Sequence, residues 1–146
     1  MNTGLLHLHN ALRWVILISL LLSIYKLYAK KDALKTSKIL LISSHTTLLL
    51  GLYQYFFGSV GLKMIQTAGM GAAMKDATTR FWAVEHISSM LIAIILITIG
   101  HIVYKKSQNG SKTTILYVIA LLLIVLAMPW PFREGIGRPW FPGMPH

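Results

Sequence analysis

Residues 81–104 read FWAVEHISSMLIAIILITIGHIVY, and this stretch decides the fold class. It holds one acidic residue and no lysine or arginine, and it exceeds the roughly 20 mostly apolar residues that a helix needs to cross a bilayer. Three further stretches have the same apolar character, at 5–28, 39–57 and 113–128. They are continuously apolar, whereas transmembrane β-strands alternate. The sequence therefore predicts an all-α, integral membrane bundle of four transmembrane helices, in a single domain spanning 1–146.

The composition excludes an ordinary soluble domain. The chain has 146 residues, of which 55% are hydrophobic and 12% are charged, whereas soluble domains carry about 25% charged residues. Most of the net charge of +10 lies in two short lysine-rich loops, 26–38 and 105–112. Because cytoplasmic loops are enriched in Lys and Arg, we expect both loops inside and an N-out/C-out topology. Such loops suit anionic lipid head groups, and no nucleic-acid-binding motif accompanies them.

Two segments lie outside the predicted spans. The outer loop 58–80 is rich in small residues and methionine, and we expect it to be ordered and to include a short helix on the membrane surface. The tail 129–146 contains all five prolines of the chain, which exclude a continuing helix. Its many aromatic residues predict that it folds back over the outer helix ends or docks on a partner subunit. The absence of cysteine excludes disulfides, c-type haem attachment and iron–sulfur ligation.

Ionisable side chains inside a bilayer are costly and mark candidate functional sites. The candidates in these spans are His9, Arg13, His45, Glu85, His86 and His101. A helical rise of about 1.5 Å per residue sorts the four histidines by depth into an outer pair, His9 and His86, and an inner pair, His45 and His101. Within the third span, His86 and His101 lie roughly 22 Å apart along the helix axis. Two haems stacked across a bilayer require a separation of this order, and haem iron accepts histidine as an axial ligand.

Each candidate also has a purely structural interpretation. Near the interface, the tip of His101 could simply reach water. Arg13 suits a haem propionate, because arginine binds carboxylates in a fork geometry, but an ion pair with Glu85 that joins the first helix to the third is the more favoured alternative. Glu85 could also relay protons or contact a quinone. His45 lies deep enough to need a polar partner, which a neighbouring helix could provide.

Three methionines of the outer loop form a further candidate group: Met64, Met70 and Met74. Thioethers suit Cu(I). Their spacing also suits one apolar face of an interfacial helix, and we favour that interpretation.

Three blocks, LLHLHNALRW, FWAVEH and MPWPFREGIGRPWF, resemble a family of short bacterial four-helix membrane proteins labelled cytochrome b-like. The resemblance covers nearly the whole chain. Its best-matching blocks hold His9, Arg13, Glu85, His86 and the turn at 129–131, and they do not include His101. The resemblance implies a bacterial inner-membrane location and haem b as cofactor, and it implies no established reaction.

These observations predict two function classes. The first is a small integral membrane b-type haem protein for electron transfer in or across the inner membrane. In it, His9 and His86 hold an outer haem, His45 with His101 holds an inner one, and Arg13 and Glu85 orient the outer site. The second is a non-catalytic accessory subunit, without a cofactor, of a larger inner-membrane complex or homo-oligomer. Transport of copper or protons is a third, weaker class, because four helices with one mid-membrane histidine make a poor pathway.

Overall fold

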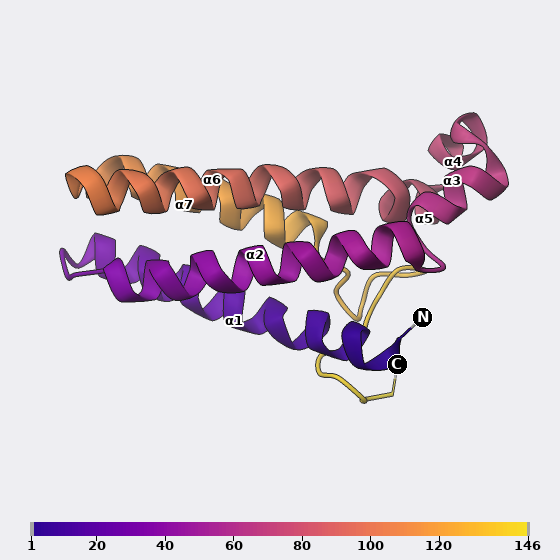
Figure 1. The fold of residues 1–146 in the computed structure, drawn as a ribbon, viewed down its shortest axis with the longest axis horizontal. Coiled ribbons are helices and arrows are strands. Elements are labelled where there is room, and N and C mark those ends of the chain that lie inside the picture. The colour runs from indigo at the N-terminus through magenta and orange to yellow at the C-terminus, as the bar shows by residue number, and fades with distance from the viewer. Residues whose placement is uncertain (1, 146) are drawn as a thin grey trace.

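The structure is a computed structural model that describes residues 2–145, and within them it is all-α, without a β-strand (Figure 1). Four long helices form an antiparallel bundle: α1 (Thr3–Tyr28), α2 (Leu34–Phe57), α6 (His86–Ser107) and α7 (Gly110–Ala127). All four belong to helical segments long and apolar enough to cross a membrane. The predicted all-α membrane bundle is therefore confirmed, and the chain has the build of a multi-pass membrane protein.

The helices follow one another around the bundle. Substantial contacts join α1 to α2, α2 to α6, α6 to α7 and α7 to α1. The pair α1 and α6 is not among the extensively contacting pairs, so these two helices lie across the diagonal of the bundle. Side chains that point inward from α1 and α6 therefore face each other across its interior.

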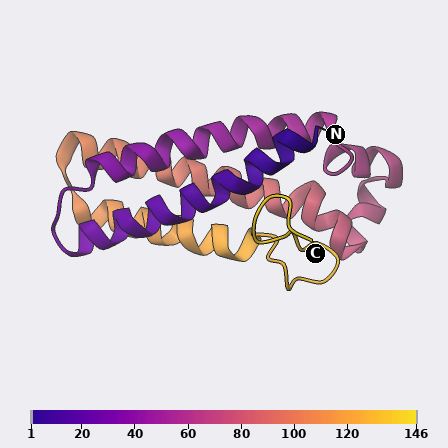
Figure 2. The same ribbon diagram turned by 90° about the horizontal axis from the view of Figure 1, so that it is seen from below.

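The two ends of the bundle differ in composition. Figures 1 and 2 place both termini at the same end as three short helices, α3 (Leu62–Ala68), α4 (Met70–Lys75) and α5 (Ala77–Arg80). We call this the termini end. The connections α1–α2 and α6–α7, with their lysines, lie at the opposite end, which we call the basic end.

Helix boundaries differ from the predicted ones by a few residues. The second helix begins at Leu34 instead of 39 and the fourth at Gly110 instead of 113, because both first turns contain lysine or hydroxyl residues that a hydropathy reading places outside the membrane. Asn109 caps α7 by accepting a hydrogen bond from the Lys112 amide at 3.0 Å. The predicted outer loop 58–80 consists largely of α3, α4 and α5.

Two of the short helices carry the loop methionines. Met64 lies on α3, and Met70 and Met74 lie on α4, where 54% and 43% of their surface is exposed. Asp76 caps α5 by accepting hydrogen bonds from the amide and the hydroxyl of Thr79. These bonds hold the pKa of the Asp76 carboxyl below its ordinary value, because they favour its charged form.

A single π-helical turn, η1 (Phe81–Glu85), connects α5 to α6. Such turns arise where one extra residue enters a helix, and they are frequent at functional sites. The η1 turn buries Phe81 and Ala83 and leads directly into His86. Its extra residue therefore sets the direction in which the first residues of α6 point.

The core of the bundle is densely packed toward the basic end. Leu20, Leu40, Ile97 and Tyr117, one from each long helix, are completely shielded from solvent. Gly100 permits this packing, because a Cβ atom at that position would lie 2.6 Å from the Tyr117 ring.

Replacing Gly100 by alanine is expected to destabilise the bundle by about 1–3 kcal/mol, the usual cost of overpacking a core. The added methyl group must displace Tyr117 and separate α6 from α7. Thermal unfolding in detergent measures the effect. Gly71→Ala is the matched control, because nothing lies within 4 Å of the Cβ it adds. Equal melting temperatures for the two variants would contradict this account of the α6–α7 contact.

Candidate functional site

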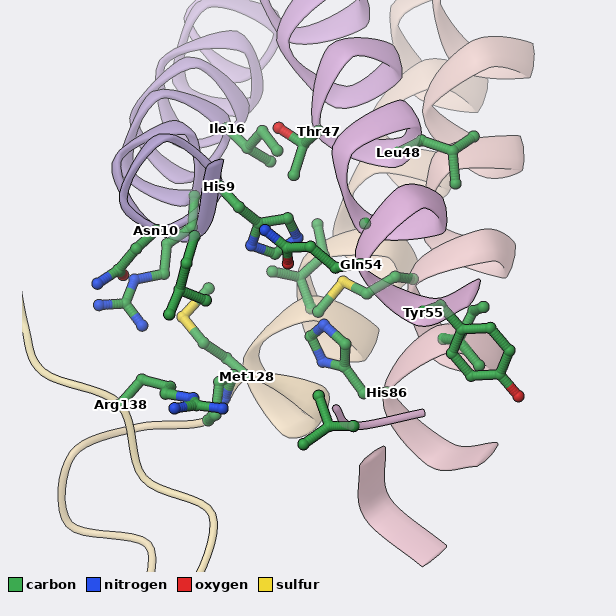
Figure 3. A pocket seen from close by; sticks show the side chains of 18 of the residues that line it. His9, Asn10, Ile16, Thr47, Leu48, Gln54, Tyr55, His86, Met128 and Arg138 are labelled. Atoms are coloured by element: carbon green, nitrogen blue, oxygen red, sulfur yellow. The ribbon is translucent and has the colours of Figure 1, made fainter. Parts of the chain in front are cut away.

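A cavity of about 340 Å³ lies at the termini end of the bundle (Figure 3). Side chains of α1, α2, η1, α6 and α7 form its walls, and the tail adds Arg138, Pro139, Pro142, Gly143 and Met144. The walls are mostly apolar, with a small group of polar side chains among them. This is the usual character of a small-molecule site, since such pockets measure about 300–1,000 Å³ and carry a few convergent polar groups.

Two histidines face each other in this cavity (Figure 3). The ring centroids of His9, from α1, and His86, from the start of α6, lie 6.5 Å apart, with 53° between the ring planes. When two imidazoles bind the same metal ion, each with a nitrogen–metal distance of about 2.1 Å, their ring centroids lie roughly 6 Å apart. The structure thus brings the predicted outer pair together in one cavity.

The hydrogen bonding of His86 prepares it to act as a ligand. Its Nδ1 lies 2.8 Å from the Ala127 carbonyl oxygen. A carbonyl only accepts, so Nδ1 carries the proton and Nε2 retains a free lone pair. Metal-binding histidines characteristically donate their other ring N–H in this way. The rings of Phe81 and Trp82, with centroids 5.6 and 5.8 Å away, hold the imidazole from the side.

His9 has room because α2 presents a glycine to it. A Cβ atom on Gly51 would lie 3.4 Å from His9 Nε2, so any longer side chain at this position would occupy the space that the ring uses.

The ligand set argues against a closed metal site. Within residues 2–145, no group of three or more histidine or acidic side chains is arranged to hold a metal ion. Structural zinc sites take four protein ligands and catalytic ones take three. Haem iron, in contrast, needs only the two axial positions from the protein. Two histidines are therefore enough protein ligands for haem.

Arg13 is buried beneath the tail. Only 7% of its surface is exposed, and its Nη2 donates to the carbonyl oxygens of Pro139 and Trp140 at 2.5 and 2.8 Å. The expected ion pair between Arg13 and Glu85 is wrong, because Glu85 Oε1 pairs instead with Arg80 Nε at 2.6 Å. Glu85 is exposed and does not line the cavity. The η1 turn directs Glu85 outward, whereas the next residue, His86, points into the cavity.

The sequence reasoning missed a second guanidinium at this cavity. Arg138, in the tail, lies with its guanidinium carbon 4.9 Å from the centre of the Trp82 ring. Burial lowers its pKa, because an apolar environment disfavours the charged form. Within the described residues Arg80–Glu85 is the one ion pair, so neither Arg13 nor Arg138 has a carboxylate partner. Arg13 is buried and donates to two tail carbonyls, and Arg138 is half-buried, so the described lining of the cavity holds two arginines and no acidic side chain.

Three cavity residues also have buried polar atoms without a hydrogen-bond partner: Asn10 Oδ1, Arg13 Nε and Gln54 Nε2. Most buried polar atoms in proteins are satisfied, so each exception needs an explanation. Three such atoms around one cavity indicate that a polar group of a ligand or water meets them. Gln54 was also missed, although an amide inside an apolar span is itself a signal, since it requires a partner there.

The predicted inner pair is not brought together. His101 is 7% exposed, and its Nδ1 lies 2.8 Å from Ser37 Oγ, which in turn lies 2.5 Å from the Tyr117 hydroxyl. The interpretation of His101 as an interfacial residue with its tip in water is therefore wrong. His45 is exposed on the outward face of the bundle, where its Nε2 meets Thr98 Oγ1 at 2.9 Å. The two histidines occupy different environments, since His101 is buried among polar side chains inside the bundle and His45 lies on its outside.

The tail closes the cavity by folding back onto α1. Trp14 Nε1 donates to the Trp140 carbonyl at 2.7 Å, and the Trp14 ring packs against the rings of Trp130, Trp140 and Phe141. Asn10 Nδ2 donates a further bond to the Pro139 carbonyl at 3.4 Å. These contacts join the tail to the same helix that presents His9.

Fold and site together define an α-helical membrane bundle with a two-histidine cavity between diagonally opposite helices. Comparison with protein-family models, with curated proteins and with solved structures finds no match to this chain. The functional argument therefore depends on the residues of the cavity.

Proposed function

We propose that this protein is a small b-type haem protein that transfers electrons within or across the bacterial inner membrane. The observation that carries the proposal is the His9–His86 pair, with ring centroids 6.5 Å apart across the diagonal of the bundle. His9 and His86 would hold the haem iron. When bound, haem b supplies a one-electron iron couple, and the chain positions it and shields it from water.

The charge of the cavity supports haem over a neutral ligand. Haem carries two propionate carboxylates, and Arg13 and Arg138 are two cavity guanidiniums that pair with no carboxylate among residues 2–145. Arginine binds carboxylates in a fork geometry, and the unpaired Arg13 Nε is a free donor for this purpose. Arg13 contacts the tail and Arg138 belongs to it, so both would bind carboxylates at the termini end.

The topology that fits this function places the termini end outside. Cytoplasmic loops are enriched in lysine and arginine, and the basic end holds both lysine-rich connections. An N-out/C-out chain in the inner membrane would therefore carry its haem near the outer leaflet.

An accessory subunit without a cofactor is the alternative, and the aromatic tail and the small-residue outer loop both favour it. Trp14 contacts the rings of Trp130, Trp140 and Phe141, but Phe132, Trp140 and Phe141 remain 75%, 44% and 54% exposed, so the tail keeps surface for a partner. A scaffold role does not, however, explain the paired histidines and the buried polar atoms of the cavity. We therefore propose the haem function ahead of it.

A reduced-minus-oxidised absorption spectrum of the purified protein, expressed with added haem precursor, tests the proposal. We expect the sharp bands of a six-coordinate b-type haem and a stoichiometry of one haem per chain, because His45 and His101 lie in different environments. A flat spectrum with adequate haem supply would refute the function. Two haems per chain would refute the assignment of a single site.

A further inference from the structure

The tail consists of two parts that are held in different ways. Residues 129–138 fold back on themselves, because the Arg138 amide donates to the Pro129 carbonyl at 2.9 Å. The Arg133 guanidinium attaches this part to α7 by donating to two carbonyls at the end of that helix. We call it the anchored turn, since a backbone bond closes it and a helix end holds it in place.

Residues 139–145, which we call the strap, are held by side chains of α1. The Pro139 carbonyl accepts a hydrogen bond from Arg13 at 2.5 Å, and the Trp140 carbonyl accepts from Arg13 and Trp14 at 2.8 and 2.7 Å. Within residues 2–145, no backbone hydrogen bond joins the strap to another element. The contacts that hold the strap can therefore break without the unfolding of any helix.

The strap is also one wall of the two-histidine cavity. Pro139, Pro142, Gly143 and Met144 line the cavity, and the end of the tail lies beside the start of α1 (Figure 1). A Cβ atom on Gly143 would lie 3.8 Å from Cε1 of His7, which is another lining residue. A molecule in the cavity would therefore contact the strap in its closed state and lose those contacts when the strap opens.

Arg13 belongs both to the cavity and to the contacts that hold the strap. It lines the cavity while its Nη2 binds the two strap carbonyls. Arg138 lines the cavity from the anchored turn (Figure 3), with its guanidinium carbon 4.9 Å from the centre of the Trp82 ring. The described lining holds no acidic side chain. An amphipathic molecule with carboxylates suits this lining, because arginine binds carboxylates in a fork geometry.

We infer that the strap is a lid whose closure is coupled to the binding of a carboxylated porphyrin in the cavity. A ligand that contacts the strap only in its closed state shifts the strap toward that state, and the coupling is reciprocal. Arg13 and Arg138 bind the carboxylates of the ligand, and the closed strap slows its escape. The choice of ligand rests on the proposed function, whereas the coupling itself needs no iron.

The strap contains a protease site that reports its opening. Chymotrypsin prefers aromatic residues, and the bond between Trp140 and Phe141 lies in the strap. In the closed strap, the Trp140 carbonyl that the protease must attack accepts hydrogen bonds from Arg13 and Trp14. Cleavage at this bond therefore follows the population of the open strap. Cleavage after Tyr28, which is 84% exposed at the basic end, is the internal reference for protease activity.

The test digests the full-length protein in detergent, in the dark, while protoporphyrin IX is titrated into it. The protein is purified after expression without added haem precursor, and mass spectrometry follows both cleavage sites. Protoporphyrin IX dimethyl ester is the matched ligand, because it has the same ring and no free carboxylate. We expect the saturating diacid to slow cleavage after Trp140 at least about tenfold relative to Tyr28, and the diester at the same concentration to slow it less than about twofold.

Two variants separate the lid from the ligand site. Trp14→Phe removes one bond to the strap from a residue outside the described lining, so cleavage without ligand should rise several-fold and protoporphyrin should still protect. Arg138→Gln removes a cavity charge that contacts Trp82. Cleavage without ligand should stay the same, and about ten times more protoporphyrin should be needed for equal protection. Trp130→Phe is the control for Trp14→Phe, because the Trp130 indole donates to an α7 carbonyl.

Unchanged cleavage after Trp140 at the highest protoporphyrin concentration would overturn the inference, and so would equal protection by the diester or equal slowing at Tyr28. The haem spectrum is recorded on a separate sample. A haem spectrum together with a strap that responds to neither haem nor protoporphyrin would remove this inference alone. Protection by protoporphyrin in a protein with a flat haem spectrum would leave this inference standing and remove the proposed function.

Discussion

Replacing His86 by alanine is expected to reduce the haem content of the purified protein at least about tenfold, since even outer partners of metal ligands contribute factors of 10–100. The variant removes a ring whose Nδ1–H is held by the Ala127 carbonyl at 2.8 Å and whose Nε2 remains free. Any residual haem should lose the six-coordinate spectrum, because the change removes one ring of the facing His9–His86 pair. Pyridine haemochrome analysis and the reduced spectrum measure both effects.

His7→Ala is the matched control for this prediction. His7 lies two residues before His9 and also lines the cavity, but it has no paired ring. Its removal should leave haem content and spectrum unchanged. If His7→Ala and His86→Ala lost haem equally, the loss would reflect a general disturbance of the termini end and not ligation.

Replacing Arg13 by alanine is expected to release the tail. The change removes the bonds to the Pro139 and Trp140 carbonyls. Each hydrogen bond from a charged group contributes about 1.5–3 kcal/mol, so the closed tail should lose about 3 kcal/mol. Since cleavage of a fast-opening segment follows the population of its open form, chymotryptic cleavage between Trp140 and Phe141 should accelerate on the order of 100-fold. Mass spectrometry of the digest measures it.

Two variants separate the geometry of Arg13 from its charge. Arg13→Lys keeps the positive charge without the planar fork, and we expect it to restore only a small part of the protection. Arg80→Ala removes an arginine whose partners, Glu85 and the Met74 carbonyl, lie outside the tail, and cleavage should stay at the original rate. Full protection in Arg13→Lys would mean that charge alone retains the tail.

The fold class was predictable because hydropathy alone determines it. Four mostly apolar runs, of about the length that crosses a bilayer, leave few other architectures. The first turns of α2 and α7 were not predictable in this way. Lys35 and Lys38 in α2 lie beyond the apolar run, and a helix continues there because its backbone bonds are satisfied internally whether or not its side chains face lipid.

The candidate site was predictable only in part. The similar depth of His9 and His86 followed from the rise of a helix, and the structure brings these two rings together. Depth does not give direction, however, so His45 and His101 had similar depths and yet face different surroundings. Arg138 escaped notice because it lies in an irregular tail, where no periodicity relates sequence position to place in space.

The π-helical turn at Phe81–Glu85 has a consequence for how the chain tolerates length changes. Each residue of an α-helix adds a rotation of about 100° about the helix axis. Deleting one residue between 81 and 85 would convert the turn to a regular α-helix and swing everything before it by about that angle relative to α6. Phe81 and Trp82 would leave the imidazole they now flank, while the hydropathy of the segment would hardly change. A family alignment should therefore show gaps in the surrounding loops and a constant residue count across this turn.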